Sequence, residues 1–271
     1  VHLDGPGGKR RSFQGELFQN QMLSPTISAM ALLESMEDTM ESEEKQTIFL
    51  KTDLRVSGHG PVELSDVSSG EDAGFPLAMR ELQMYDALLS NPCEFPNVKS
   101  LDFHVHILNG WKSARLDSLN IDRTEVKPGS VLHAVIGVRN FRGESSSIPI
   151  SVPIPAELDS GEVQLFVGDA DAAMRMDELP RVPPQTLHQV LDRIRKLRSH
   201  QNIYVKILQN VRGVSLEGRN LPDLPPSVMA QFESPNAHFQ MASLSRVTLW
   251  ETNFPVDGTF SGQITLPVRI K

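Results

Sequence analysis

Two histidines in the stretch 101–107 are the side chains best placed to bind a metal. His104 and His106 alternate with Phe103, Val105 and Ile107, which is the pattern of a β-strand with one buried face. Alternate residues of a strand project from the same face about 6.7 Å apart, so both imidazoles could reach one ion. The surrounding sequence offers no further ligands. We expect solvent-facing histidines, with a metal site at His104 and His106 as the alternative, and no bound cofactor.

An acidic run later in the chain has the composition of a calcium loop. Its acidic members are Asp169, Asp171, Asp177 and Glu178. An EF-hand loop needs an Asp or Asn where this chain has Ala173, and a glycine where it has Met174. The run therefore predicts a surface loop that joins a strand to a helix.

The common catalytic motifs are absent from the sequence. It contains no Gly-x-Ser-x-Gly elbow, no His-Glu-x-x-His, no glycine-rich phosphate loop and no Cys-x-x-Cys pair. The single cysteine, Cys93, lies near Pro92 and Pro96, which predicts a turn and an inert thiol. We expect no catalytic residue. A catalytic triad of Ser, His and Asp from distant positions in the sequence remains an open alternative, because triads are defined by geometry and not by order.

Length and charge exclude several classes of protein. The chain has 271 residues and a formal net charge of −8, so it repels nucleic acid and anionic membranes. No apolar run approaches the roughly 20 residues that span a bilayer, and the N-terminus lacks the pattern of a signal peptide. We expect two domains and no transmembrane segment.

The first 110 residues predict a mixed α+β domain with two helices. Strands are expected at 12–19, 46–56 and 101–107, a polar loop at 65–74, and helices from Ser24 to about residue 40 and at 75–89. The apolar stripe expected in the first helix is Ile27, Met30, Leu33, Met36 and Met40. This helix ends in an acidic stretch, residues 34–44, which predicts a solvated end, with a bound cation or a basic partner as the alternative.

Residues 111–271 predict an antiparallel, Ig-like β-sandwich. Valine- and isoleucine-rich runs alternate with turns at short intervals. The expected strands are 114–119, 131–138, 148–154 and 163–167, a hairpin of 203–208 with 211–216, and strands at 239–250 and 260–270, with a turn and short helix at 221–232. The overall class is α+β, predominantly β.

One amphipathic helix is expected as an insertion in this second domain, at about 184–199. Its core face is Leu187, Val190, Leu191, Ile194 and Leu197. Its last turns are rich in Arg and Lys, which complements the negative end of a helix, with an anionic partner as the alternative.

Prolines mark two strands as sheet edges. Pro149 and Pro153 fall in the strand at 148–154, and Pro267 falls in the strand at 264–270; proline cannot donate to a central ladder. Edges can add a strand from a partner or from another copy of the chain. The candidate interaction residues are Ile148, Ile150, Val152, Ile264, Leu266 and Val268.

Several stretches resemble the region that follows the catalytic part of exported SpoIVB-type serine peptidases, particularly those of acidobacterial kind. They are Leu23-Ser24-Pro25, Val126-Lys127-Pro128-Gly129-Ser130-Val131, Leu165-Phe166-Val167-Gly168-Asp169, Ile203-Tyr204-Val205-Lys206-Ile207-Leu208 and Leu224-Pro225-Pro226-Ser227-Val228. The Gly-Met-Ser-Gly-Ser-Pro motif that holds the nucleophile of that family is absent. The resemblance implies a non-catalytic region and a periplasmic or extracellular location.

Three functions are open at this point. The first is a non-catalytic accessory or structural module that acts through protein contacts, including contacts with its own copies. The second is a substrate-positioning or regulatory part of a serine peptidase whose catalytic domain lies upstream. The third is a cell-wall or carbohydrate-binding module, for which the two Trp and two Tyr of the chain are few.

Overall fold

The structure is a computed structural model that describes residues 1–39, 45–177, 183–216, 219–221, 225, 228 and 241–271. The predicted α+β, predominantly β class is confirmed. The chain forms two compact units. The first unit comprises Val1–Ser113, Pro184–Gln201 and Val256–Thr259, and the second comprises Ala114–Pro183, Asn202–Pro255 and Phe260–Lys271.

A five-stranded sheet forms the base of the first unit. The strand order is β2-β1-β5-β3-β4, and all neighbours are antiparallel except β1 and β5. The strands are β1 (His2–Asp4), β2 (Arg10–Ser12), β3 (Gln46–Val56), β4 (Val62–Gly70) and β5 (Val98–Asn109), with the 3-10 turn η1 (Pro6–Gly8) between β1 and β2. The predicted strand at 46–56 is confirmed, and the one at 101–107 lies within β5.

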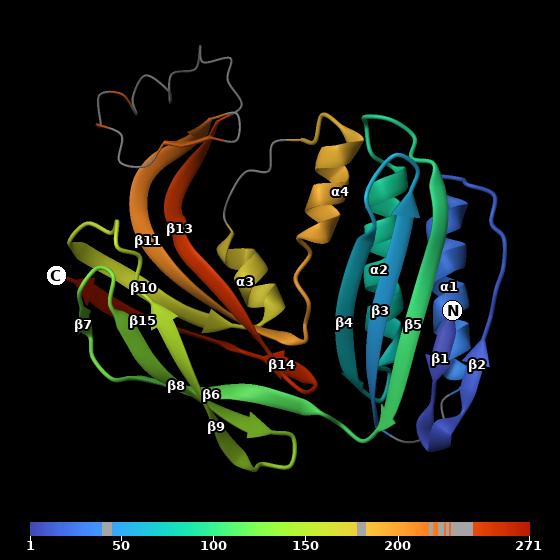
Figure 1. Ribbon diagram of the computed structural model, residues 1–271, viewed down its shortest axis with the longest axis horizontal. Helices are drawn as coiled ribbons and strands as arrows, with labels where there is room; N and C mark the ends of the chain where they lie inside the picture. The colour runs from blue at the N-terminus through green and yellow to red at the C-terminus, as the bar shows by residue number, and fades with distance from the viewer. Residues whose placement is uncertain (40–44, 178–182, 217–218, 222–224, 226–227, 229–240) are drawn as a thin grey trace. The chain divides into compact units, whose positions relative to one another are not determined.

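Three helices of the first unit pack on this sheet. They are α1 (Leu23–Glu37), α2 (Gly74–Leu89) and α4 (Leu187–Arg195), and Figure 1 shows α1 and α2 against one face of the sheet. Even-numbered residues of β3, such as Ile48 and Leu54, are fully buried in the two hydrophobic clusters beneath these helices. Because side chains alternate along a strand, odd-numbered residues such as Lys51 and Asp53 face the other way. The opposite face therefore carries Lys51 and Asp53, but it also carries Phe49 and, opposite it on β4, the buried Val67.

The buried face of α1 differs from the predicted one. Met36 is buried, but Ile27 and Met30 are 43% and 64% exposed, and Met40 lies outside the described residues. Most of the side chains that α1 buries are small: Ser24, Pro25, Ser28, Ala29, Leu32, Ser35 and Met36. The helix packs so closely on α2 that a Cβ added at Gly74 would lie 3.3 Å from the Met36 Cε atom. Close approach favours small residues, so the buried face keeps Met36 and part of Leu33 from the predicted stripe but not Ile27 or Met30.

Two further predictions for the first unit are wrong. The strand expected at 12–19 ends at Ser12, the last residue of β2. The polar loop expected at 65–74 is largely the strand β4, whose Val62 and Val67 are buried. This strand was missed because it lies at the sheet edge and because Ser and Asp residues dilute its apolar pattern.

The helix expected within the second domain, α4, belongs to the first unit. Its Leu187, Val190, Leu191 and Ile194 are buried, as the spacing predicted, whereas Leu197 is 47% exposed. The four buried side chains pack into the hydrophobic cluster that contains Leu54 and residues of α2. An amphipathic pattern gives the buried face of a helix but not the domain against which it packs.

The second unit contains two sheets. The six-stranded sheet has the order β12-β11-β10-β15-β7, and β13 also pairs with β11. Its strands are β7 (Glu125–Val126), β10 (Gly161–Gly168), β11 (Asn202–Leu216), β12 (Arg219–Leu221), β13 (Met241–Pro255) and β15 (Gln263–Ile270). The other sheet has the order β14-β6-β8-β9, with β6 (Ser113–Ile121), β8 (Val131–Asn140), β9 (Ser145–Pro153) and β14 (Thr259–Ser261).

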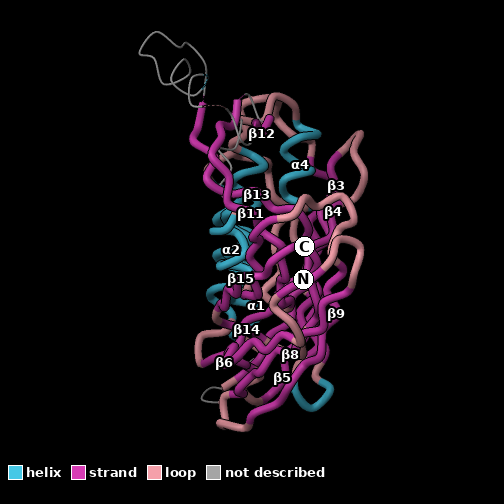
Figure 2. Tube along the Cα trace, turned by 90° about the vertical axis from the view of Figure 1, so that its left-hand side faces the viewer, coloured by secondary structure: helices cyan, strands magenta, loops and turns pink. Residues whose placement is uncertain are grey.

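The longest strands of the second unit differ from their predicted forms. The expected hairpin at 203–216 is the single strand β11, and irregularities in its pairing with β13 replace the turn. The closing strand expected at 260–270 is divided by Gly262, whose φ is +104°. Figure 2 shows β11 and β13 side by side. The turn and helix predicted at 221–232 lie mostly outside the described residues.

Candidate functional site

The two histidines for which a metal site was the alternative, His104 and His106, lie exposed on the face of the first sheet that is turned away from its helices. His104 stacks on His2, with the ring centroids 5.0 Å apart, and its Nε2 atom lies 3.5 Å from the Asp53 carboxylate. His106 lies instead beside Phe49, with centroids 6.5 Å apart. The two histidines therefore have different neighbours. Within the described residues, no group of three His, Cys, Asp or Glu side chains is placed to hold a metal ion.

The predicted acidic loop after β10 is a helix, α3 (Ala170–Met176). Asp169 is its N-cap: one carboxylate oxygen accepts from the Ala172 N–H and the other from the Gly262 N–H, both at 2.7 Å. This capping supports the start of the helix. Asp177 follows the last turn, and Glu178 lies outside the described residues. Asp169 therefore serves the fold here.

Lys206 is a fully buried cation in the second unit. Its Nζ atom donates to the Ala173 carbonyl at 2.9 Å and to the Asp177 carboxylate at 2.5 Å, and lies 3.5 Å from the Glu251 carboxylate. The carbonyl belongs to the C-terminal part of α3, where a positive charge is favourable. Two carboxylates offset the cost of burying the ammonium group. Lys206 thus joins α3 to β11 and β13.

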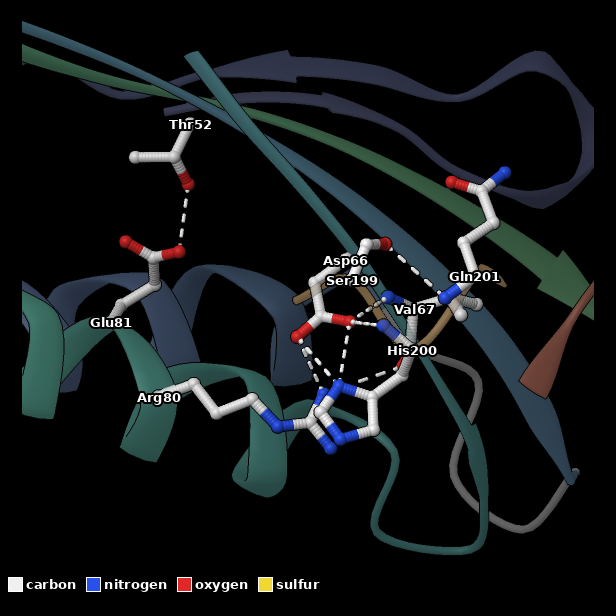
Figure 3. Close-up of polar contacts among 8 residues, drawn as sticks. All are labelled: Thr52, Asp66, Val67, Arg80, Glu81, Ser199, His200 and Gln201. Carbon is white, nitrogen blue, oxygen red and sulfur yellow. Dashed lines mark hydrogen bonds and ion pairs between the residues drawn. The ribbon is translucent and has the colours of Figure 1, made fainter. Parts of the chain in front are cut away.

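A buried ionic cluster in the first unit was not predicted from the sequence. Figure 3 shows Asp66 of β4 between Arg80 of α2 and His200. The Asp66 carboxylate accepts from Arg80 Nη1 at 2.6 Å, from the backbone N–H of His200 at 2.9 Å, and lies 3.1 Å from His200 Nδ1. It also accepts from the N–H of Val67 at 2.8 Å. The cluster ties the segment after α4 to β4 and α2.

The charge state of Asp66 follows from these contacts. Burial acts to raise the pKa of its carboxyl group, but the hydrogen bonds and charge of His200, together with the charge of Arg80, outweigh burial and hold that pKa below its ordinary value. Asp66 is therefore an anion at neutral pH.

A histidine on a buried carboxylate is one half of a catalytic triad, which also needs a nucleophile. In such a triad the carboxylate orients the imidazole and stabilises its cation. Here Asp66 shares its charge with Arg80, and it binds the backbone N–H of His200 as well as the ring. The neighbouring Ser199 hydroxyl accepts from the Gln201 N–H at 3.2 Å, as in a local turn. The geometry is that of a clamp on the backbone.

Glu81, next to Arg80 on α2, is a second buried carboxyl group. Oε1 accepts from the Thr52 hydroxyl at 2.8 Å, while Oε2 is buried without a hydrogen-bond partner among the described residues. Burial raises the pKa of Glu81 to about 7; the Thr52 hydroxyl opposes this shift and the Asp66 charge adds to it. The group therefore titrates near neutral pH.

Charged and thiol side chains near helix ends are also engaged within the first unit. Asp38, at the acidic end of α1, forms an ion pair with Arg11. Arg195, in the basic end of α4, donates to the Gly60 carbonyl at 2.8 Å and to Asp192. The Cys93 thiol is half-buried and lies 3.2 Å from the Pro184 carbonyl. These contacts give each of them a structural role.

The predicted edge at 148–154 is β9, which pairs with β8 and with no other described strand. The His133 carbonyl accepts from the Asp122 N–H on the β6 side, so Ser151, which lies opposite His133, faces the open edge. Pro149 and Pro153 share that orientation. The open edge of β9 therefore lacks two amide donors.

The predicted edge at 264–270, β15, pairs with β10 along its length and with β7 only at Arg269 and Ile270. The Arg269 N–H donates to Thr124 on that side, so Pro267, two residues earlier, also faces outward. Ile150, Val152 and Val268 are buried, and Ile148, Ile264 and Leu266 are half-buried. Contact at either edge would thus involve backbone more than these side chains.

The strand β13 is also an edge of its sheet, and this edge was not predicted. This strand has 15 residues, pairs with β11 and with no other described strand, and has no proline before Pro255. Strand alternation gives the direction of its peptide groups. The Arg269 N–H faces β7, so even-numbered residues of β15 face β10. Following the residue pairs from β15 through β10 to β11 places the backbone N–H of Val205 on the side of β13. Thr252 lies opposite Val205 and faces β11, so its neighbour Asn253 faces outward.

No protein-family model matches this chain, and no curated protein or solved structure is detectably similar to it. None of the described helices is long and apolar enough to cross a membrane.

Proposed function

We propose that this chain is a non-catalytic module that holds other polypeptides by β-strand addition at the outer edge of β13. The observation that carries the proposal is the contrast between β13 and the two predicted edges, β9 and β15. Prolines face outward on β9 and β15, whereas β13 offers 15 residues without an interior proline. Outward prolines are a common protection against unwanted strand pairing. An edge left without them is available for pairing.

The polar clusters support a non-catalytic role. Asp66 binds four donors, Lys206 joins three elements of its unit, and Asp169 caps α3. Each of these groups has a structural task in the described chain. The resemblance to the region outside the catalytic part of SpoIVB-type peptidases agrees with this proposal, and with it we propose a periplasmic or extracellular location. We also propose that the two sheets of the second unit pack as a sandwich, because β8 buries every second side chain and most of β10 is buried.

Selection of peptides tests this proposed function. We expect a displayed library of random 12-residue peptides to yield binders to the wild-type chain that bind at least about tenfold more weakly to Asn253→Pro. The substitution removes an outward amide donor and leaves the bonds to β11 in place. The matched control is Thr265→Pro, which places a proline at an outward position of β15.

Binders that lose affinity for N253P and keep it for T265P would support the proposed function. Failure to select any binder would contradict it. Binders that ignore both substitutions would place the contact elsewhere and would also contradict it.

A further inference from the structure

The outer edge of β13 has a self-complementary pattern near its middle. Thr248 lies opposite Leu208, an even-numbered residue of β11 that faces β10, and Thr248 therefore faces outward. Arg246 lies opposite Asn210 and faces outward for the same reason. The register shift between Ile207 and Leu208 inserts one extra β13 residue between Thr248 and the stretch that holds Glu251. Arg246 and Glu251 thus lie one outward position on either side of Thr248.

The side chains of Arg246 and Glu251 lie on the same face of the sheet. The Glu251 carboxylate lies 3.5 Å from Lys206 Nζ, which also donates to the Ala173 carbonyl of α3. Arg246 Nη1 lies 2.9 Å from the sulfur of Met176, which is also a residue of α3. Both side chains therefore face α3. The Nε atom of Arg246 is buried and has no hydrogen-bond partner among the described residues. A buried donor without an acceptor is costly. Arg246 as a whole is partly exposed, so a carboxylate from across the edge would meet the charge of its guanidinium group and not the inaccessible Nε atom.

We infer that the occupant of the β13 edge is a second copy of this chain, added antiparallel about a two-fold axis at Thr248. Thr248 then lies opposite the second copy's Thr248, and Arg246 lies opposite the second copy's Glu251. The two-fold axis creates this charge pair twice, as expected for an isologous interface. Opposite charges and Thr pairs across strands are favourable. This inference rests on the proposed function and names the partner.

Analytical ultracentrifugation of the full chain over a range of concentrations tests the inference. We expect the wild-type chain to approach twice its monomer mass as concentration rises, and Thr248→Pro to remain monomeric. The control Thr265→Pro places the same change on the outward side of β15 and should associate like wild type. Circular dichroism and urea unfolding show that each variant is folded.

A charge reversal provides a second variant that leaves the backbone unchanged. Arg246→Glu replaces two attractive pairs with two repulsive ones, so we expect the dissociation constant of the dimer to rise by roughly tenfold or more at low salt. Because salt screens exposed charges, the difference from wild type should shrink at high salt.

A wild-type chain that stays monomeric at every concentration would overturn the inference, as would a dimer that persists in T248P. The proposed function survives either of these results if selected peptides still bind more weakly to N253P. If no such peptides can be selected, the proposed function is wrong, even if the chain dimerises through another surface.

Discussion

Replacing Asp66 with alanine should lower the free energy of unfolding by about 3 to 5 kcal/mol at pH 7. Removing one member of a buried charged network leaves the other members without a partner. Here Arg80 loses its carboxylate, and His200 loses the acceptor for its backbone N–H and its ring. The Asp66 side chain is 17% exposed and that of His200 13% exposed, so water replaces these contacts poorly. Urea denaturation measures the change.

The matched control is Asp4→Ala, which breaks a pair with Arg10 on the surface of the same unit. These two side chains are 58% and 86% exposed, and such pairs contribute at most about 1 kcal/mol. If D66A cost no more than D4A, the clamp would be a minor feature. A peptide or ester hydrolysis activity that disappeared in D66A without loss of stability would contradict the non-catalytic account.

Asp66 also predicts sensitivity to acid. Its pKa is lower in the folded state than the ordinary value of 3.8, so its stabilising effect is complete above that value and is lost as pH falls through the folded pKa. D66A lacks this contribution, and the stability difference between wild type and D66A should shrink below about pH 4. A difference that stayed constant down to pH 2 would rule out the carboxylate charge as its cause.

Replacing Glu81 with glutamine should remove a loss of stability that the wild type undergoes between about pH 4.5 and 7. The folded state raises the pKa of this group from 4.5 to about 7. The folded protein therefore binds a proton more tightly than the unfolded chain, and its stability falls as pH rises through this window. At 1.36 kcal/mol per pKa unit the full loss is about 3 kcal/mol. Glutamine is neutral throughout, so E81Q should be the more stable protein at pH 8.

Urea denaturation of both proteins at pH 4.5 and pH 8 measures this effect. The lowered pKa of Asp66 keeps this group charged in both proteins at these pH values, so its own titration cancels, whereas its repulsion of ionised Glu81 is part of the effect that E81Q removes. Thr52→Val provides a second variant: loss of the hydroxyl that donates to the Glu81 carboxylate raises the pKa further, so T52V should be less stable than wild type mainly at pH 8. If the free energy of unfolding changed with pH in the same way for wild type and E81Q, ionisation of Glu81 would not destabilise the fold, and the prediction would be wrong.

The fold class and most element positions could be predicted from the sequence because they depend on local patterns. The strict alternation around Phe103 and the 3.6-residue spacing from Leu187 to Ile194 gave the right buried faces. Patterns failed where packing depends on small side chains, as on α1, or where a strand carries polar residues at an edge, as in β4. The place of α4 in the first unit depends on its partners, which no local pattern encodes.

The candidate sites were harder to predict for the same reason. Asp66 and His200 are separated by 134 residues, and neither lies in a motif that links them. Prolines correctly marked β9 as an edge, but the sequence did not show that they face outward. No residue type in the sequence identifies β13 as an edge. Its edge position follows from its pairing with β11 alone among the described strands, and the outward prolines found on β9 and β15 are absent from it.

Amide hydrogen exchange along β13, followed residue by residue in dilute solution, shows whether the outer edge of this strand is open. An open edge predicts an alternating pattern: the amides of Thr252 and Phe254, which face β11, exchange slowly, and those of Thr248 and Asn253 exchange fast. At high concentration the outward amides should become protected as well. Slow exchange at every position in dilute monomer would mean that another element already covers this edge, and the account would be wrong.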